Sequence, residues 1–258
     1  MQNLILTLLL TLFLSFSVLS CANTNSNLPR QTRDTFVKIE QTVTIIVCNP
    51  NNKKECVAKD SKSSGSGAVV KVTPAGSYVL TAGHVCEFEN QARIAREVNA
   101  SSIHVFMESV DFELARYTSE VINIDRNIDT CLLFAHNLWT REEARLASPN
   151  RSLKEGDRVY NVAAPVGIFY RNVVPILEGF FMGNRDVRAY YSIPAMGGSS
   201  GSPIFNSNSE LIGMIHSVNV YFPVISVSPP KNMLIKFVEN SIAMGEEIRA
   251  ARINKSAE

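Results

Sequence analysis

Short runs rich in β-branched and aromatic residues recur along this chain, with polar and turn-forming residues between them and no internal repeat. Such a pattern predicts many short strands and therefore an all-β fold. In the first half the expected strands are Thr42–Val47, Ala68–Val72, Tyr78–Thr81, Ser102–Met107, Glu120–Ile124 and Cys131–Ala135. In the second half they are Arg158–Val162, Val173–Met182, Arg188–Ile193, Pro203–Phe205, Leu211–Val218 and Tyr221–Ser226.

A candidate nucleophile lies in the small-residue segment Gly198-Ser199-Ser200-Gly201-Ser202-Pro203. A glycine two residues before Ser200 lets the amides of Gly198 and Ser200 point at one spot, where they would form an oxyanion hole. A competing interpretation is the Gly-x-Ser-x-Gly nucleophile elbow with Ser199 as nucleophile. That motif requires a following helix, whereas an apolar run typical of a strand follows here, and no aspartate lies downstream.

A serine hydroxyl needs a neutral imidazole as base and a carboxylate that orients the imidazole. The string Thr81-Ala82-Gly83-His84 ends an apolar run with a histidine that small residues leave accessible. Asp129 directly precedes another apolar run and is the preferred carboxylate, because Asp125 precedes residues typical of a solvated turn. The predicted catalytic residues are therefore His84, Asp129 and Ser200.

The chain order His-Asp-Ser, the Thr-Ala-Gly-His string and the serine motif together resemble the trypsin-like serine peptidases, with Ser202 where that family has glycine. Leu153–Val159, Ala164–Gly167 and Leu177–Phe180 resemble the HtrA-type branch, and Gly201–Pro203 resembles the serine motif of glutamyl endopeptidases. The similarity covers roughly residues 60 to 240. Because the chain ends at Glu258, no PDZ domain is expected.

The resemblance implies two six-stranded antiparallel β-barrels of chymotrypsin-like fold with a C-terminal α-helix. The helix is expected because Leu234, Phe237, Val238 and Ile242 have helical spacing. The expected divisions are a signal peptide 1–20, a polar tether 21–34, an N-terminal barrel 35–140 with His84 and Asp129, a crossover linker 141–155, a C-terminal barrel 156–228 with Ser200, and a helix and tail 229–258.

The implied function is an exported serine endopeptidase that hydrolyses polypeptides through an acyl-enzyme, as a monomer and without metal or organic cofactor. A net charge of +1 gives no sign of a nucleic-acid partner. Two alternatives stay open. One is a catalytically inactive trypsin-like binding module, and the other is an esterase that uses the same triad.

The substrate pocket is expected a few residues before the nucleophile and along the strand after Gly213, at Ile193, Pro194, Ala195, His216, Ser217 and Val218. None of these residues is acidic, so a small or apolar residue before the scissile bond is expected rather than Lys or Arg. Glutamyl endopeptidases carry a histidine two residues after the glycine, whereas His216 follows Gly213 by three. Successive side chains on a strand point to opposite faces, so this difference of one residue favours a His216 side chain that faces Asp129 rather than the substrate.

The segment from Asn3 to Ser20 is almost continuously apolar and predicts a signal peptide. Cys21 follows it in a string that resembles a lipobox and is a candidate for lipidation. Cleavage elsewhere with release, and an uncleaved membrane anchor, are the alternatives. The expected location is thus the periplasm, the cell envelope as a lipoprotein, or the medium.

Four further cysteines in an exported chain predict disulfides. Cys48 and Cys56 flank a turn-rich loop, which favours a local bridge. Cys86 lies two residues after His84 and Cys131 two residues after Asp129, so a triad would bring this second pair together. The alternative is four buried free thiols.

Overall fold

The computed structural model describes residues 32–50, 52–140 and 142–256. The expected signal peptide, Cys21 and the tether up to residue 31 lie outside the described residues. In the part that is described, no helix is both long and apolar enough to cross a membrane.

The first half of the chain forms a closed antiparallel barrel in the order β1-β2-β3-β6-β5-β4, which confirms the six-stranded barrel expected there. Its inward side chains form the larger apolar core, with Leu80, Leu132 and Phe134 fully buried. The strands are β1 (Phe36–Asn49), β2 (Asn52–Thr73), β3 (Gly76–Ala82), β4 (Ser102–Val110), β5 (Arg116–Asp125) and β6 (Thr130–His136).

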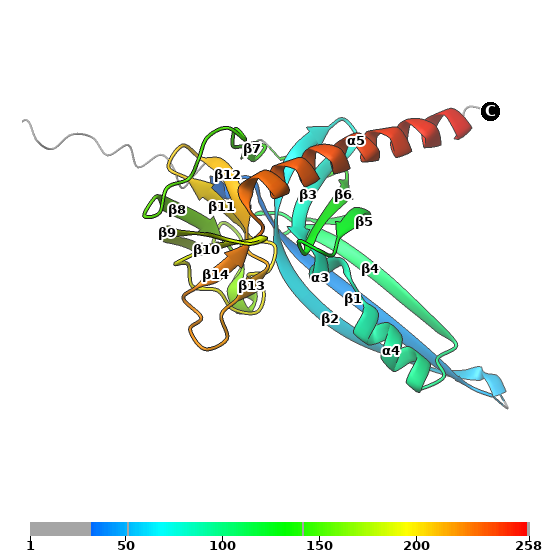
Figure 1. Ribbon diagram of the computed structural model, residues 1–258. Coiled ribbons are helices and arrows are strands. Elements are labelled where there is room, and N and C mark those ends of the chain that lie inside the picture. Colours follow the sequence, from blue (N-terminus) through cyan, green and yellow to red (C-terminus); the bar gives the residue numbers. More distant parts are fainter. Residues whose placement is uncertain (1–31, 51, 141, 257–258) are drawn as a thin grey trace, which may run out of the picture.

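The strands β1 and β2 are much longer than the sequence pattern predicted, and they leave the barrel as an extended hairpin (Figure 1). Their register is unbroken from Phe36↔Ala68 to Cys48↔Cys56. A disulfide joins Cys48 to Cys56 near the tip. The short helices α3 (Gly83–Cys86) and α4 (Glu89–Glu97) follow β3, and α4 lies alongside the hairpin in contact with β1 and β4 (Figure 1).

The second half forms a sheet in the order β13-β14-β10-β9-β8-β11-β12-β7. The His216 N–H donates to the Val227 carbonyl (3.0 Å) and the Met214 N–H to the Ser228 hydroxyl (2.9 Å), so the chain after β12 meets β14 and the sheet curls on itself. The strands are β7 (Arg145–Leu146), β8 (Arg158–Val162), β9 (Ile176–Arg185), β10 (Arg188–Tyr191), β11 (Pro203–Asn206), β12 (Glu210–Met214), β13 (Ser217–Val218) and β14 (Ser226–Ser228), with the 3-10 turn η1 (Pro165–Gly167) between β8 and β9.

This second sheet differs from the sequence-based expectation in its details. Among the described residues it has eight strands rather than six, because the crossover contributes the two-residue β7 and the expected strand Leu211–Val218 divides into β12 and β13. The strand expected at Tyr221–Ser226 is wrong. The Asn219 side-chain oxygen accepts hydrogen bonds from the N–H groups of Tyr221 and Phe222, and this turn delays the strand until Ser226.

The expected C-terminal helix is confirmed as α5 (Lys231–Ser256), which begins directly after Pro229-Pro230. Leu234, Phe237 and Val238 belong to the core of the first barrel, whereas Ile235 belongs to the separate core of the second. The helix therefore joins both halves, and Figure 1 shows it running along one side of the molecule.

Candidate active site

The strand β3 delivers His84 to the edge of the first barrel, where α3 begins. The Gly83 N–H donates to the Asp129 carbonyl at 2.9 Å. A Cβ atom on Gly83 would lie 2.9 Å from Asp129 Oδ1 and 3.1 Å from the Asp129 carbonyl carbon, so a larger residue would displace the carboxylate. The glycine before the histidine therefore allows the close approach of base and carboxylate.

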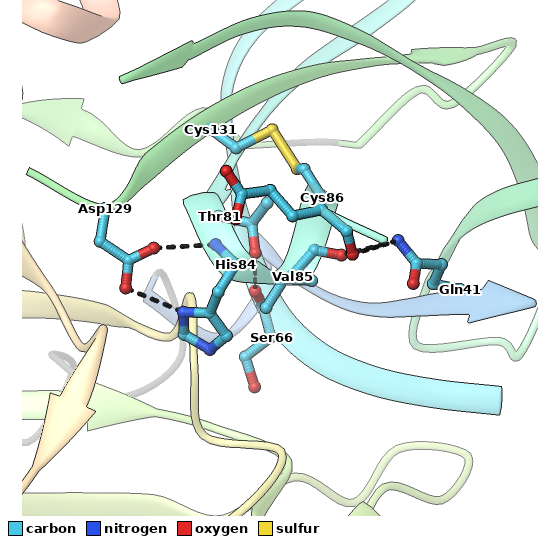
Figure 2. The surroundings of a disulfide bond; sticks show 9 residues. Gln41, Ser66, Thr81, His84, Val85, Cys86, Asp129 and Cys131 are labelled. Carbon is cyan, nitrogen blue, oxygen red and sulfur yellow. Dashed lines mark hydrogen bonds and ion pairs between the residues drawn. A yellow bond between two sulfur atoms is a disulfide. The ribbon is translucent and has the colours of Figure 1, made fainter. Parts of the chain in front are cut away.

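Asp129 holds His84 at two points (Figure 2). Its Oδ1 accepts the His84 backbone N–H at 2.8 Å, and its Oδ2 lies 2.8 Å from His84 Nδ1. With the proton on Nδ1, the ring donates to the carboxylate and leaves Nε2 as a base. Asp129 has a φ of 49°, a left-handed conformation that aspartate tolerates better than most residues. This geometry is the imidazole–carboxylate arrangement that the sequence predicted.

His216 lies on the other side of the same carboxylate. Its Nδ1 is 3.5 Å from Asp129 Oδ2, and 13% of its side chain is exposed. The structure thus places His216 beside Asp129, the side that its register favoured.

The surroundings shift the pKa values of this pair in opposite directions. Burial acts to raise the pKa of the Asp129 carboxyl, but hydrogen bonds from His216 and His84 outweigh it and hold that pKa well below its ordinary value. The hydrogen bond to Asp129 raises the pKa of the His84 imidazole, although burial opposes it. Asp129 therefore stays ionised and stabilises a protonated His84.

The turn that carries Ser200 needs glycine at two positions. Gly198 has a φ of 92° and Gly201 a φ of 87°, both in the left-handed region. A Cβ atom on Gly201 would collide with the Ser66 carbonyl and the Thr81 hydroxyl of the first barrel. The serine motif is therefore packed tightly against the strands that lead to His84.

The amides of Gly198 and Ser200 are oriented by the carbonyls at the other end of the same peptide groups. Gly197 O accepts the Val166 N–H at 2.6 Å, and Ser199 O accepts the Ser202 N–H at 3.0 Å. In a trans peptide the C=O and N–H point in opposite directions, so the Gly198 and Ser200 N–H groups point away from these partners. Within the described residues neither amide has a protein acceptor. Two such donors can bind a developing oxyanion.

Ser66 connects this turn to the first barrel, a role that sequence reasoning missed. Its N–H donates to Ser200 O at 2.7 Å, and its hydroxyl donates to Gly198 O at 2.8 Å. The same hydroxyl accepts the Ala164 N–H at 3.0 Å. A serine between two glycines was the available signal in the sequence, but the burial of Ser66 and its distant partners are seen only in the structure.

The two adjacent serines differ in their surroundings. Ser199 is 1% exposed and its hydroxyl accepts the Met196 N–H at 3.2 Å, so it is part of the turn's own structure. Ser200 is partly exposed, and its hydroxyl has no hydrogen bond among the described residues. No helix follows the motif, since β11 begins at Pro203. These features favour Ser200 over Ser199 as the nucleophile.

The residues expected to line the substrate pocket differ in accessibility. Ile193 is completely buried and Ala195 nearly so, both within the core of the second half. Pro194 and Ser217 are exposed, and Val218 is partly exposed. The accessible residues of the expected pocket are thus Pro194, His216, Ser217 and Val218.

The second disulfide joins Cys86 to Cys131, with a sequence separation of 45 residues. It ties α3, which carries His84, to β6, which follows Asp129 (Figure 2). Both disulfides have the pairing expected from the sequence, and the alternative of four free thiols is wrong. In the described part of the chain, no group of three or more His, Cys, Asp or Glu side chains could hold a metal ion.

One comparison with known proteins identifies a family. The family model of the trypsin-like peptidase domain matches residues 65–214, which is more than half of the 258-residue chain. No curated protein matches the sequence significantly. The matched range begins beside Ser66 and includes His84, Asp129 and Ser200.

Proposed function

This chain belongs to the trypsin-like peptidase domain family, and on that premise we propose that it is a serine endopeptidase with His84, Asp129 and Ser200 as its catalytic triad. The observation that carries the proposal is the His84–Asp129 pair, joined at 2.8 Å, in a fold where the amides of Gly198 and Ser200 have no acceptor among the described residues. Acyl transfer requires an oriented imidazole, a serine and an oxyanion hole.

In the proposed reaction the Ser200 hydroxyl attacks the carbonyl carbon of the scissile peptide while His84 Nε2 takes its proton. The amides of Gly198 and Ser200 stabilise the oxyanion, each by about 3 to 4 kcal/mol. His84 then gives the proton to the leaving amine, and the acyl group stays on Ser200. Water, deprotonated by His84, hydrolyses this ester. Hydrogen bonds between base and nucleophile often form only when substrate is bound.

Labelling with a fluorophosphonate probe tests the nucleophile. We expect Ser200→Ala to abolish labelling, whereas Ser199→Ala and Ser202→Ala retain it. Because Ser199 and Ser202 are buried, circular dichroism spectra must show that these control variants fold. Labelling that survives in Ser200→Ala but not in folded Ser199→Ala would assign the nucleophile to Ser199.

Substitution of the two candidate carboxylates tests the orienting residue. Asp129→Asn should lower kcat by roughly four orders of magnitude, because the imidazole then loses its tautomer control. Asp125→Asn is the matched control, since among the described residues the Asp125 carboxylate accepts the Asn127 N–H in a turn and does not contact His84. An equal loss from Asp125→Asn contradicts the assignment.

Cleavage of a peptide library, followed by mass spectrometry, separates the alternatives. An esterase would hydrolyse simple esters but no peptides, and an inactive binding module would not react with the probe. We propose a preference for small or apolar residues before the scissile bond. The accessible Pro194, Ser217 and Val218 support this preference because none of them is acidic.

The disulfides favour a compartment outside the cytoplasm. We propose that the protein is exported and acts as a monomer in the periplasm, at the envelope through lipidation of Cys21, or in the medium. The mass of the mature N-terminal peptide distinguishes lipidation at Cys21 from cleavage elsewhere. Membership of the HtrA-type or glutamyl-endopeptidase branch remains part of this proposal, on the motifs described above.

A further inference from the structure

Two residues of unusual type meet beneath the turn 198–202, which carries Ser200, the proposed nucleophile. Asn161 lies in β8, although asparagine is uncommon inside strands, and Ser202 stands where the family has glycine. Both are completely buried, and Asn161 Nδ2 donates to the Ser202 hydroxyl at 2.8 Å. A buried hydroxyl needs a hydrogen-bond partner, so the two departures are one feature of the fold.

The side-chain amide of Asn161 holds two consecutive residues where the chain leaves this turn. Its second N–H donates to the Pro203 carbonyl, also at 2.8 Å. An asparagine amide nitrogen carries two hydrogens, so both are used. Asn161 lies opposite Ile204 in the register of β8 and β11, and it therefore ties the chain directly after the turn to the second sheet.

Ser202 in turn orients one of the two oxyanion donors. Its N–H donates to the Ser199 carbonyl at 3.0 Å, and the opposite end of that peptide group is the Ser200 N–H. Gly201, which precedes Ser202, has no side chain and a φ of 87°, so it does little to hold the peptide group that carries the Ser202 N–H. The Ile215 N–H holds the Ser202 carbonyl at 2.9 Å, which belongs to the next peptide group. The contact with Asn161 is therefore the side-chain anchor of the donor's orientation.

Stability alone does not account for this pair. Asn161 Oδ1 is buried and has no hydrogen-bond partner among the described residues. An unsatisfied buried oxygen costs stability, whereas replacing both partners of a buried hydrogen bond by apolar groups can be nearly neutral. An apolar residue at position 161 facing glycine at position 202 would fill the same space without that cost. The unsatisfied oxygen therefore calls for a role of Asn161 beyond packing.

We propose that Asn161 is a positioning residue that acts through Ser202 to fix the Ser200 N–H of the oxyanion hole. This deepens the proposed function and rests on it. Ser66 of the first barrel holds the carbonyls of Gly198 and Ser200, and Asn161 of the second sheet holds the residues that follow. The turn is thus anchored from both halves. Because an oxyanion forms only during the reaction, loss of the Asn161 anchor should lower kcat and leave KM unchanged.

Two single variants test the connection. Asn161→Leu changes the volume little and removes both hydrogen bonds, whereas Ser202→Ala removes only the hydroxyl. With a peptide that the wild type cleaves, we expect kcat to fall roughly 10- to 100-fold in each variant, because a displaced oxyanion donor loses part of its effect. KM should stay within about twofold of the wild type. The maximal rate of fluorophosphonate labelling should fall in the same proportion as kcat, since the Ser200 hydroxyl is intact and only the oxyanion donor is displaced.

The double variant and a matched control separate positioning from stability. If Asn161 acts through Ser202, Ser202→Ala in the Asn161→Leu background should lower kcat no further, because both changes break the same connection. Asn206→Ala is the control, since Asn206 is also a buried asparagine and its amide contacts Glu210 at the far end of β11. It should lower Tm, measured by circular dichroism, without lowering kcat.

A wild-type kcat in folded Ser202→Ala would overturn the proposal, and so would a loss that appears in KM instead. Losses that multiply in the double variant would show that the two residues act independently, which also contradicts it. If Asn206→Ala lowers kcat as much as Asn161→Leu does, general destabilisation is responsible and the positioning role is wrong. Ser202→Ala keeps the bond from Asn161 to Pro203, so it still decides if Asn161→Leu fails to fold.

The wild type itself tests the premise. If it neither reacts with fluorophosphonate nor cleaves any peptide of the library, the proposed function fails and the positioning role fails with it. An active wild type with unaffected variants removes only the role of Asn161.

Discussion

Ser66→Ala is the substitution whose effect on stability can be worked out most fully from the structure. The Ser66 hydroxyl donates to the Gly198 carbonyl and accepts the Ala164 N–H, and Ser66 is fully buried. Alanine leaves both groups without their partner, and an unsatisfied buried polar group costs about 1 to 3 kcal/mol. Because Gly198 is partly exposed, water can replace some of the loss. We therefore expect the free energy of unfolding to fall by about 2 to 4 kcal/mol.

For a protein of this size, that change corresponds to a fall in Tm of roughly 4 to 16 °C. Thermal unfolding followed by circular dichroism or calorimetry measures it. The matched control is Ser61→Ala on the same strand, because Ser61 is exposed and its change should stay within about 0.5 kcal/mol. The variant should also lose roughly 10- to 100-fold in kcat, since the oxyanion turn loses one of its anchors.

Two outcomes would refute this reasoning. If Ser66→Ala melts within about 1 °C of Ser61→Ala, the two hydrogen bonds of the hydroxyl contribute no net stability. If Tm falls but kcat is unchanged, Ser66 stabilises the fold without positioning the turn that carries Ser200.

Three further predictions follow from the site. Asp129 raises the pKa of His84, and only neutral His84 can act as the base. A pH–rate profile should therefore show kcat/KM falling with decreasing pH through a midpoint above 6.5. A midpoint below 6.5 contradicts this prediction. His216→Ala should lower kcat for all peptides in equal proportion, and a selective loss of cleavage after Glu in a mixed-substrate assay would instead make it a specificity residue. Replacing Cys86 and Cys131 together by serine should cost about 4 kcal/mol in urea unfolding, from closure of a 45-residue loop, and a cost below about 1 kcal/mol would show that the bridge is dispensable.

The sequence alone located the histidine and carboxylate of the candidate site because each is encoded by a short contiguous string. The string before His84 needs small residues for close packing, and Asp129 needs a position directly before a buried strand. Short runs of β-branched and aromatic residues between turn residues likewise located most barrel strands, and helical spacing located α5. These features depend on neighbours in the chain, so local patterns are sufficient to predict them.

The length of β2 and the presence of α4 were not predicted for a physical reason. From Val57 to Ser64 both faces of the strand are exposed. Neither face has to be apolar, so the segment shows no alternation of apolar and polar residues. The helix α4 has nine residues and Ile94 is its single large apolar side chain, so its sequence contains no apolar stripe long enough to predict a helix. The pairing of β2 with β1, and the packing of α4 against β1 and β4, give these segments their structure rather than an intrinsic pattern.

What only the tertiary structure decided is how the two halves meet at Ser200, the proposed nucleophile. The hydroxyl of Ser66 reaches Gly198 across 132 positions and Ala164 across 98, and the Val166 N–H orients the peptide before Gly198. The sequence named the residues that can perform the chemistry, because reactive groups and glycine-dependent turns are properties of single residues and their neighbours. It could not name the residues that aim them, because a buried serine or a loop amide acquires that role only from partners brought near it by folding.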